Sequence, residues 1–194
     1  MFAPAFPDLP SPGATIAVHQ GDCVVSRDPT TVLSTVLGSC IAACVWDSQA
    51  RLGGMNHFLL AAPGHNAADR WGASARYGAF AMEQLLNTVL AQGSGRKANL
   101  VLKLFGGARI TAALTVVGAG NIAFVQRFMA QEGYQPAAQD LGGTSARRVL
   151  FAPASGRAFV KRLDLGDGAS IARAELDFAS RQARGPAGGD VDLF

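Results

Sequence analysis

The sequence predicts a single domain of the α/β or α+β class, on three observations. Its 23 glycines and 9 prolines imply many tight turns and short connections. Several short runs are rich in β-branched residues, as strands are, whereas longer stretches repeat apolar residues at helical spacing. With 194 residues, of which 49% are hydrophobic, the chain is long enough for one well-buried core and short for two.

The first 37 residues are expected to hold three strands. Residues 1–13 contain four prolines and are expected to form a loose arm. Ala14–His19 and Cys23–Ser26 are β-type runs on either side of the turn Gln20-Gly21-Asp22. Thr31–Leu37, which is rich in β-branched residues, is the third strand.

A hairpin and a long helix are expected next. The apolar runs Ile41–Trp46 and Met55–Leu60 are joined by a polar segment with two glycines, which predicts a hairpin. After a polar loop at Pro63–Gly72, apolar residues recur every three to four positions from Ser74 to Gln92, which predicts a helix ending at Gly93. The apolar run Asn99–Phe105 is expected to be a buried strand.

The last third is expected to hold a helix, a second hairpin and a short terminal helix. Asn121 is a good N-cap residue for a helix that reaches Gly133. Runs at 148–152 and 158–163 flank a Ser-Gly turn, which predicts two paired strands. An amphipathic pattern at 170–184 predicts a short helix, and the glycine- and aspartate-rich tail beyond it is expected to be frayed.

Charge and cysteine content exclude several classes of function. The net charge is +3, and no basic run is longer than the pairs Arg147-Arg148 and Lys161-Arg162, so nucleic acid is not an expected partner. Three cysteines, an odd number in a chain too large to need disulfides, favour a reducing compartment. Neither a signal-peptide pattern nor an apolar run of membrane-spanning length is present, so we expect a cytoplasmic protein without membrane insertion.

Cys40 and His57 are the strongest candidates for chemistry. Cys40 follows a Gly38-Ser39 turn, whose N–H groups could lower the thiol pKa and hold an oxyanion. His57 lies on the expected partner strand, so a hairpin would bring its imidazole to the thiol. There the imidazole can take the thiol proton and later protonate a leaving group.

The imidazole also needs a group that orients its ring. Ser34 or Thr35 can supply a hydroxyl from the preceding strand, whereas Asp47 is more simply explained as a turn residue. Cys44 and Cys23 lie among apolar β-type residues and are expected in the core. No histidine or cysteine spacing matches a zinc motif, so neither a metal nor a cofactor is expected.

One segment imitates a dinucleotide-binding motif. Gly118-Ala119-Gly120 begins a GxGxxA pattern after an apolar run, and Asp140 follows at the distance expected for a ribose-binding acid. Against this alternative, the run before Asp140 is a weak strand containing Pro136, and too few residues follow for a second mononucleotide half. Asn121 as a helix cap explains the same residues more simply.

Six short motifs occur in one order along the chain. They are Leu37-Gly38-Ser39-Cys40, Gly53-Gly54-Met55-Asn56-His57, Arg76-Tyr77-Gly78 with Ala81-Met82-Glu83, Lys103-Leu104-Phe105-Gly106-Gly107-Ala108, Gly118-Ala119-Gly120-Asn121 and Asp140-Leu141-Gly142-Gly143. Each is weak alone, but their order and spacing from about Ala14 to about Arg162 closely resemble the CheD family of chemoreceptor glutamine deamidases.

This resemblance implies a cytoplasmic chemotaxis enzyme that converts chosen glutamine side chains of chemoreceptors to glutamate. It implies a layered sandwich of mixed β-sheets with two main flanking helices, related to deamidases of the cytotoxic necrotizing factor type. The domain would span 14–165, after an arm at 1–13 and before an extension at 166–194. The resemblance also implies chemoreceptors as substrates and, in organisms that have it, CheC as a second partner.

The family's site residues fall on particular positions of this chain. Its nucleophile corresponds to Cys40 and its histidine to His57, and its threonine six positions before the cysteine corresponds to Ser34, with Thr35 as the alternative. We expect the N–H groups of Ser39 and Cys40 to hold the oxyanion. Phe105, Gly106 and Gly107 are expected at the substrate or partner surface.

Two other functions compete with deamidation. A cysteine-dependent esterase acting on receptor methyl esters could use the same pair of side chains. A binding module without catalysis would keep the docking motifs and tolerate the loss of the thiol. The presence of both Cys40 and His57 favours an enzyme.

Overall fold

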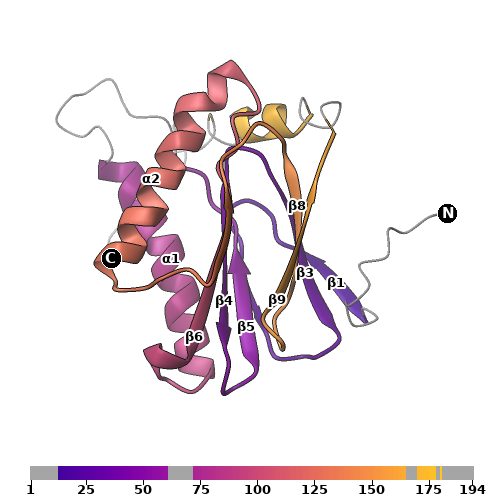
Figure 1. Cartoon of the computed structure of the whole chain (residues 1–194), viewed down its shortest axis with the longest axis vertical. Coiled ribbons are helices and arrows are strands. Elements are labelled where there is room, and N and C mark those ends of the chain that lie inside the picture. Colours follow the sequence, from indigo (N-terminus) through magenta and orange to yellow (C-terminus); the bar gives the residue numbers. More distant parts are fainter. Residues whose placement is uncertain (1–12, 61–71, 165–169, 178–179, 181–194) are drawn as a thin grey trace, which may run out of the picture.

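The computed structural model describes residues 13–60, 72–164, 170–177 and 180. Within these ranges, nine strands form two sheets, of order β2-β5-β4-β6-β7 and β1-β3-β8-β9 (Figure 1). The elements are β1 Ala14–Ala17, β2 Cys23–Ser26, β3 Thr31–Leu37, β4 Ile41–Asp47, β5 Leu52–Asn56, α1 Gly72–Gln92, η2 Lys97–Asn99, β6 Leu100–Gly106, η3 Ala112–Leu114, α2 Thr115–Gln131, β7 Ala138–Leu141, β8 Arg147–Ala152 and β9 Arg157–Arg162.

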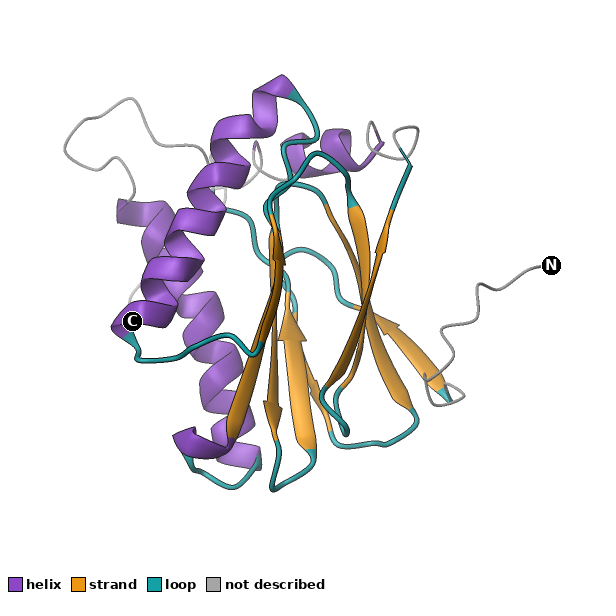
Figure 2. Ribbon diagram, in the orientation of Figure 1, coloured by secondary structure: helices purple, strands orange, loops and turns teal. Residues whose placement is uncertain are grey.

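The molecule has three layers, seen edge-on in Figure 2. Helices α1 and α2 cover one face of the five-stranded sheet, with apolar residues such as Val89 and Phe128 packed between them and the sheet. The four-stranded sheet covers the other face, where Leu33 and Leu37 of β3 meet Cys44 of β4. Both sheets are mixed, because β1–β3 and β6–β7 are parallel pairs among antiparallel ones. The predicted sandwich of mixed sheets with two main flanking helices is confirmed.

The predicted hairpin is present with a shorter turn. Strands β4 and β5 pair antiparallel from Asp47↔Leu52 to Cys44↔Met55. The sequence placed Gly53 in the turn, whereas it belongs to β5 and pairs with Trp46. The carboxylate of Asp47 instead closes the turn by accepting hydrogen bonds from the N–H groups of Gln49 and Ala50. Asp47 is therefore a turn residue.

Helix α2 corrects two predictions. It begins at Thr115 rather than Asn121, and Asn121 is fully buried within it. Gly118, Ala119 and Gly120 are thus helical residues and cannot form the phosphate-binding loop between a strand and a helix, so the dinucleotide interpretation is wrong. The local sequence does not distinguish an asparagine that caps a helix from one buried inside it, because an apolar helical pattern follows the asparagine in both cases.

Other differences concern the sheet edges and the chain ends. Strands β1 and β2 join different sheets rather than one hairpin, and β7, which had been considered weak, pairs in parallel with β6. Residues 170–177 are helical, as predicted. The expected arm, the loop after the hairpin and the frayed tail fall almost wholly outside the described residues. Among the helices of the described residues, none combines the length and apolarity needed to cross a membrane.

Candidate active site

The β4–β5 hairpin brings Cys40 and His57 to one end of the five-stranded sheet. Beyond the strands, Ile41 and Phe58 form an antiparallel bridge in which each N–H donates to the other's carbonyl at 2.9 Å. Cys40 and His57 each adjoin one member of this bridge in the chain. This pairing places Cys40 and His57 on neighbouring segments at the same end of the sheet, and a direct approach of thiol to imidazole stays a prediction.

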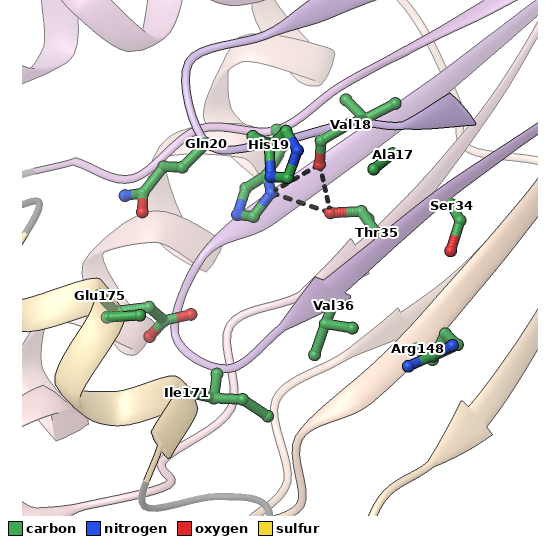
Figure 3. A pocket seen from close by; sticks show the side chains of 12 residues that line it. Ala17, Val18, His19, Gln20, Ser34, Thr35, Val36, Arg148, Ile171 and Glu175 are labelled. Carbon is green, nitrogen blue, oxygen red and sulfur yellow. Dashed lines mark hydrogen bonds between the residues drawn. The ribbon is translucent and has the colours of Figure 1, made fainter. Parts of the chain in front are cut away.

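Thr35 holds the ring of His57 in one tautomer. Its hydroxyl lies 2.8 Å from the carbonyl oxygen of Val18, which can only accept, so the hydroxyl proton is used there (Figure 3). The Thr35 oxygen is 2.9 Å from Nδ1 of His57, and it must accept a hydrogen bond from an N–H at that nitrogen. Nδ1 is also 3.4 Å from the same carbonyl, which again requires Nδ1–H. The Nε2 lone pair is left free to act as a base.

Ser34 does not take this position. Successive side chains of a strand point to opposite faces, and Thr35 shares the inward face with the buried Leu33 and Leu37. Figure 3 shows Ser34 apart from the contacts that join Thr35 and Val18. The expectation that Ser34 contacts the imidazole is corrected, and the alternative, Thr35, makes the contact. The alternation of Leu33, Thr35 and Leu37 was the sequence signal for this choice.

Burial sets the protonation of both reacting groups. Desolvation lowers the pKa of His57, and its Nε2 is buried without a hydrogen-bond partner among the described residues. Desolvation also raises the pKa of the Cys40 thiol, and the nearby carboxylate of Glu175 raises it further. In this conformation the pair is a neutral thiol and a neutral imidazole.

The turn before Cys40 presents three successive N–H groups to one carboxylate. The N–H groups of Gly38, Ser39 and Cys40 donate to Glu175 at 2.9, 2.9 and 3.3 Å. The Ser39 hydroxyl lies 2.6 Å from the same carboxylate. This turn therefore binds a negatively charged oxygen beside the thiol, as an oxyanion hole must. Sequence reasoning missed Glu175, because no local pattern links it to a turn 135 positions earlier.

Residues behind the turn fix its shape. Gly107 donates its N–H to the carbonyl of Cys40 at 2.8 Å. Gly106 has a φ of 117°, and a Cβ at this position would lie 2.0 Å from the Cys40 carbonyl oxygen, so only glycine fits. Phe105, Gly106 and Gly107 are buried, so they support the turn and do not offer the partner surface that was expected of them.

Asn121 ties the turn to the segment after His57. Its side-chain N–H donates to the carbonyl of Ser39 at 2.8 Å, and its side-chain oxygen accepts from the N–H of Leu60 at 2.9 Å. Both partners are backbone groups in a buried region. Asn121 therefore positions the backbone of the site. The sequence had predicted a helix cap at this residue, and so it did not indicate this role.

Replacing Asn121 with alanine is expected to lower the free energy of unfolding by about 2–3 kcal/mol, because two buried backbone groups lose their partner. Urea denaturation followed by circular dichroism measures this change. Asn87, exposed on α1, supplies the matched control, and its replacement by alanine should change the stability little. Equal stability of the two variants would contradict the positioning role.

A cleft of about 640 Å³ opens beside this site. Thr35 and His57 line its sheet side, and Ile171, Ala174 and Glu175 of the terminal helix line the opposite side. Cys40 is fully buried and does not line the cleft. The cleft therefore reaches His57 and stops short of Cys40.

The other cysteines lie apart from this chemistry. Cys44 is fully buried in the core between the sheets, where desolvation raises its thiol pKa. Burial raises the pKa of Cys23 to about 11. All three cysteines are free thiols. Among the described residues, no cluster of histidine, cysteine and acidic side chains could hold a metal ion.

A buried cysteine, a neutral imidazole and a row of anion-binding N–H groups are the components that nucleophilic attack on a carbonyl carbon requires. Comparison with known proteins agrees. The family model described as CheD chemotactic sensory transduction matches residues 59–162. The chain belongs to the CheD family.

Similar relatives match nearly the whole chain. A probable chemoreceptor glutamine deamidase CheD 1 of Ruegeria sp. (strain TM1040) is 47% identical over 188 residues, covering 93% of this chain and 96% of that protein. A probable chemoreceptor glutamine deamidase CheD of Acidiphilium cryptum (strain JF-5) is 46% identical, with 92% and 93% covered. That of Caulobacter vibrioides (strain NA1000 / CB15N) is 44% identical, with 96% and 97% covered.

Proposed function

We propose that this chain is a protein-glutamine glutaminase that converts glutamine side chains of chemoreceptors to glutamate in the cytoplasm. The observation that carries the proposal is the imidazole of His57, which has its proton on Nδ1 and a buried Nε2 that has no hydrogen-bond partner among the described residues. The names of the relatives supply the substrate, a chemoreceptor glutamine.

The proposed reaction passes through a thioester. His57 Nε2 takes the thiol proton as Cys40 Sγ attacks the carboxamide carbon, and the N–H groups of Ser39 and Cys40 hold the oxyanion. The C–N bond then breaks as the imidazolium gives its proton to departing ammonia. Water, deprotonated by the same imidazole, attacks the thioester, and release of the thiol leaves glutamate. The sum is one amide and one water converted to one carboxylate and one ammonium ion.

The test is mass spectrometry of receptor peptides incubated with the protein. Wild type should exchange the amide NH₂ of chosen glutamines for OH, and Cys40→Ala should give no detectable exchange, because the nucleophile is gone. Cys23→Ala, which removes a thiol outside the site, should retain the wild-type rate.

Other outcomes would identify the competing functions. Loss of a methyl ester in place of an amide would favour the receptor methylesterase. Amide exchange that is equal with Cys40→Ala, or absent with both proteins on a receptor that a known deamidase modifies, would contradict the proposal and favour a binding module. CheC, where the organism has it, is expected to compete with the receptor, so its addition should slow the exchange.

A further inference from the structure

Glu175 occupies the groups that a substrate would need. Its carboxylate accepts hydrogen bonds from the N–H groups of Gly38, Ser39 and Cys40 and from the hydroxyl of Ser39, at 2.6 to 3.3 Å. The proposed reaction uses N–H groups of this same turn to hold the oxyanion of the attacked carboxamide. While Glu175 is bound there, a substrate carbonyl cannot bind.

The same side chain controls access to the thiol. Glu175 points from its helix into the cleft (Figure 3) and lines it, whereas Cys40 is fully buried and does not. A substrate that enters the cleft must therefore displace Glu175 before it reaches Cys40. The structure is that of a closed enzyme.

The burial of this carboxylate is specific. Glu175 is 4% exposed, whereas its neighbours Leu176 and Asp177 on the helix are exposed. A buried charge is unfavourable unless it is hydrogen-bonded, and the turn supplies those bonds. Gly38 makes the approach possible, since a Cβ there would lie 3.0 Å from both carboxylate oxygens.

We propose that helical residues 170–177 occupy the binding place of a substrate helix, with Glu175 in the position of the glutamate that the reaction produces. This inference rests on the proposed function. Glutamate has the same side-chain length as the substrate glutamine, and here it reaches the turn from an α-helix. The partner that fits this site is therefore a helix that carries a glutamine on the face turned toward the cleft. Helical residues 170–177 compete with this partner for the site. The apparent affinity for substrate is therefore lowered in proportion to the fraction of molecules in which Glu175 is bound to the turn.

Glu175→Ala tests the competition. It should raise the initial rate of receptor-glutamine conversion several-fold at receptor concentrations below saturation, and it should speed alkylation of Cys40 by iodoacetamide. Asp177→Ala removes the same charge from an exposed position of the same helix and should leave both rates unchanged. A Glu175→Ala variant that is as slow as wild type, or slower, would overturn the proposal, because Glu175 would then serve only to support the turn.

Glu175→Gln tests whether residue 175 lies where the substrate side chain binds, since the substitution replaces a glutamate, the product side chain, by a glutamine, the substrate side chain. The introduced glutamine should be converted to glutamate within its own chain, with first-order kinetics that do not depend on protein concentration. The tryptic peptide 174–181 would gain the mass expected for exchange of NH₂ for OH. Asp177→Gln on the same helix should keep its amide, as should Glu175→Gln combined with Cys40→Ala.

The two hypotheses fail in different ways. If receptor glutamines are converted while the amide introduced by Glu175→Gln persists, the inference is overturned and the proposed function stands. If neither amide is hydrolysed, the proposed function is overturned and the inference falls with it. Conversion of the introduced glutamine that requires Cys40 supports both.

Discussion

Replacing His57 with glutamine is expected to lower the rate of receptor deamidation by about 10³-fold, because one imidazole performs every proton transfer of the reaction. The closed site leaves the thiol protonated, since burial and the Glu175 carboxylate raise its pKa. Without a base, almost no thiolate forms at neutral pH. Mass spectrometry of receptor peptides over time measures the rate.

The pH profile identifies His57 as the base. Desolvation lowers its pKa from the ordinary value of 6.5, so the neutral imidazole persists at pH values below 6.5. The wild-type rate should therefore stay level down to that pH and fall only in more acidic solution, and the residual rate of His57→Gln should lack this fall. His19, the other described histidine lining the cleft, provides the control, because His19→Gln should keep the rate and the acidic fall. That fall should move only slightly toward neutral pH, since His19 makes the smallest contribution to the lowered pKa of His57. A wild-type rate that falls above pH 6.5 would contradict this assignment.

The placement of Cys40 and His57 at the same end of one sheet was predictable because the information is local. Cys40 directly precedes the first strand of the hairpin and His57 directly follows the second. Two apolar runs joined by a segment with glycines are enough to predict such a hairpin. The length of the turn was misjudged, since Gly53 and Gly54 resemble turn residues and yet are strand residues of β5. This error did not affect the site, because the Ile41–Phe58 bridge aligns the segment that carries His57.

The remaining site residues depend on contacts between distant segments. Asn121 reaches the turn from α2, 82 positions after Ser39, and Glu175 reaches it from the terminal helix. Asparagine before an apolar helical pattern and glutamate in an amphipathic helix are both ordinary surface features, so neither residue carries a local sign of burial. Their roles arise only when the layers pack.

The hydroxyl of Thr35 orients the imidazole of His57. Thr35→Val is therefore expected to lower the deamidation rate by about 10²-fold. Valine keeps the branched shape and removes the hydroxyl, so the Nδ1–H loses the nearer of its two acceptors and keeps only the Val18 carbonyl at 3.4 Å. The fraction of imidazole with a free Nε2 lone pair therefore decreases. The free energy of unfolding should fall by about 1–3 kcal/mol, because the buried hydrogen bonds of the hydroxyl to the Val18 carbonyl and to His57 Nδ1 are both lost. Peptide mass spectrometry and urea denaturation separate the two effects.

Two further variants decide between Thr35 and Ser34. Thr35→Ser should recover most of the rate, because the hydroxyl that accepts from Nδ1 and donates to the Val18 carbonyl is restored. Ser34→Ala should stay near wild type, since the side chain at 34 points to the opposite face of β3 from the one at 35. If Ser34→Ala lost the rate while Thr35→Val kept it, the family position six residues before Cys40 would be the orienting residue. The contact seen between Thr35 and His57 would then belong only to the closed form that Glu175 holds.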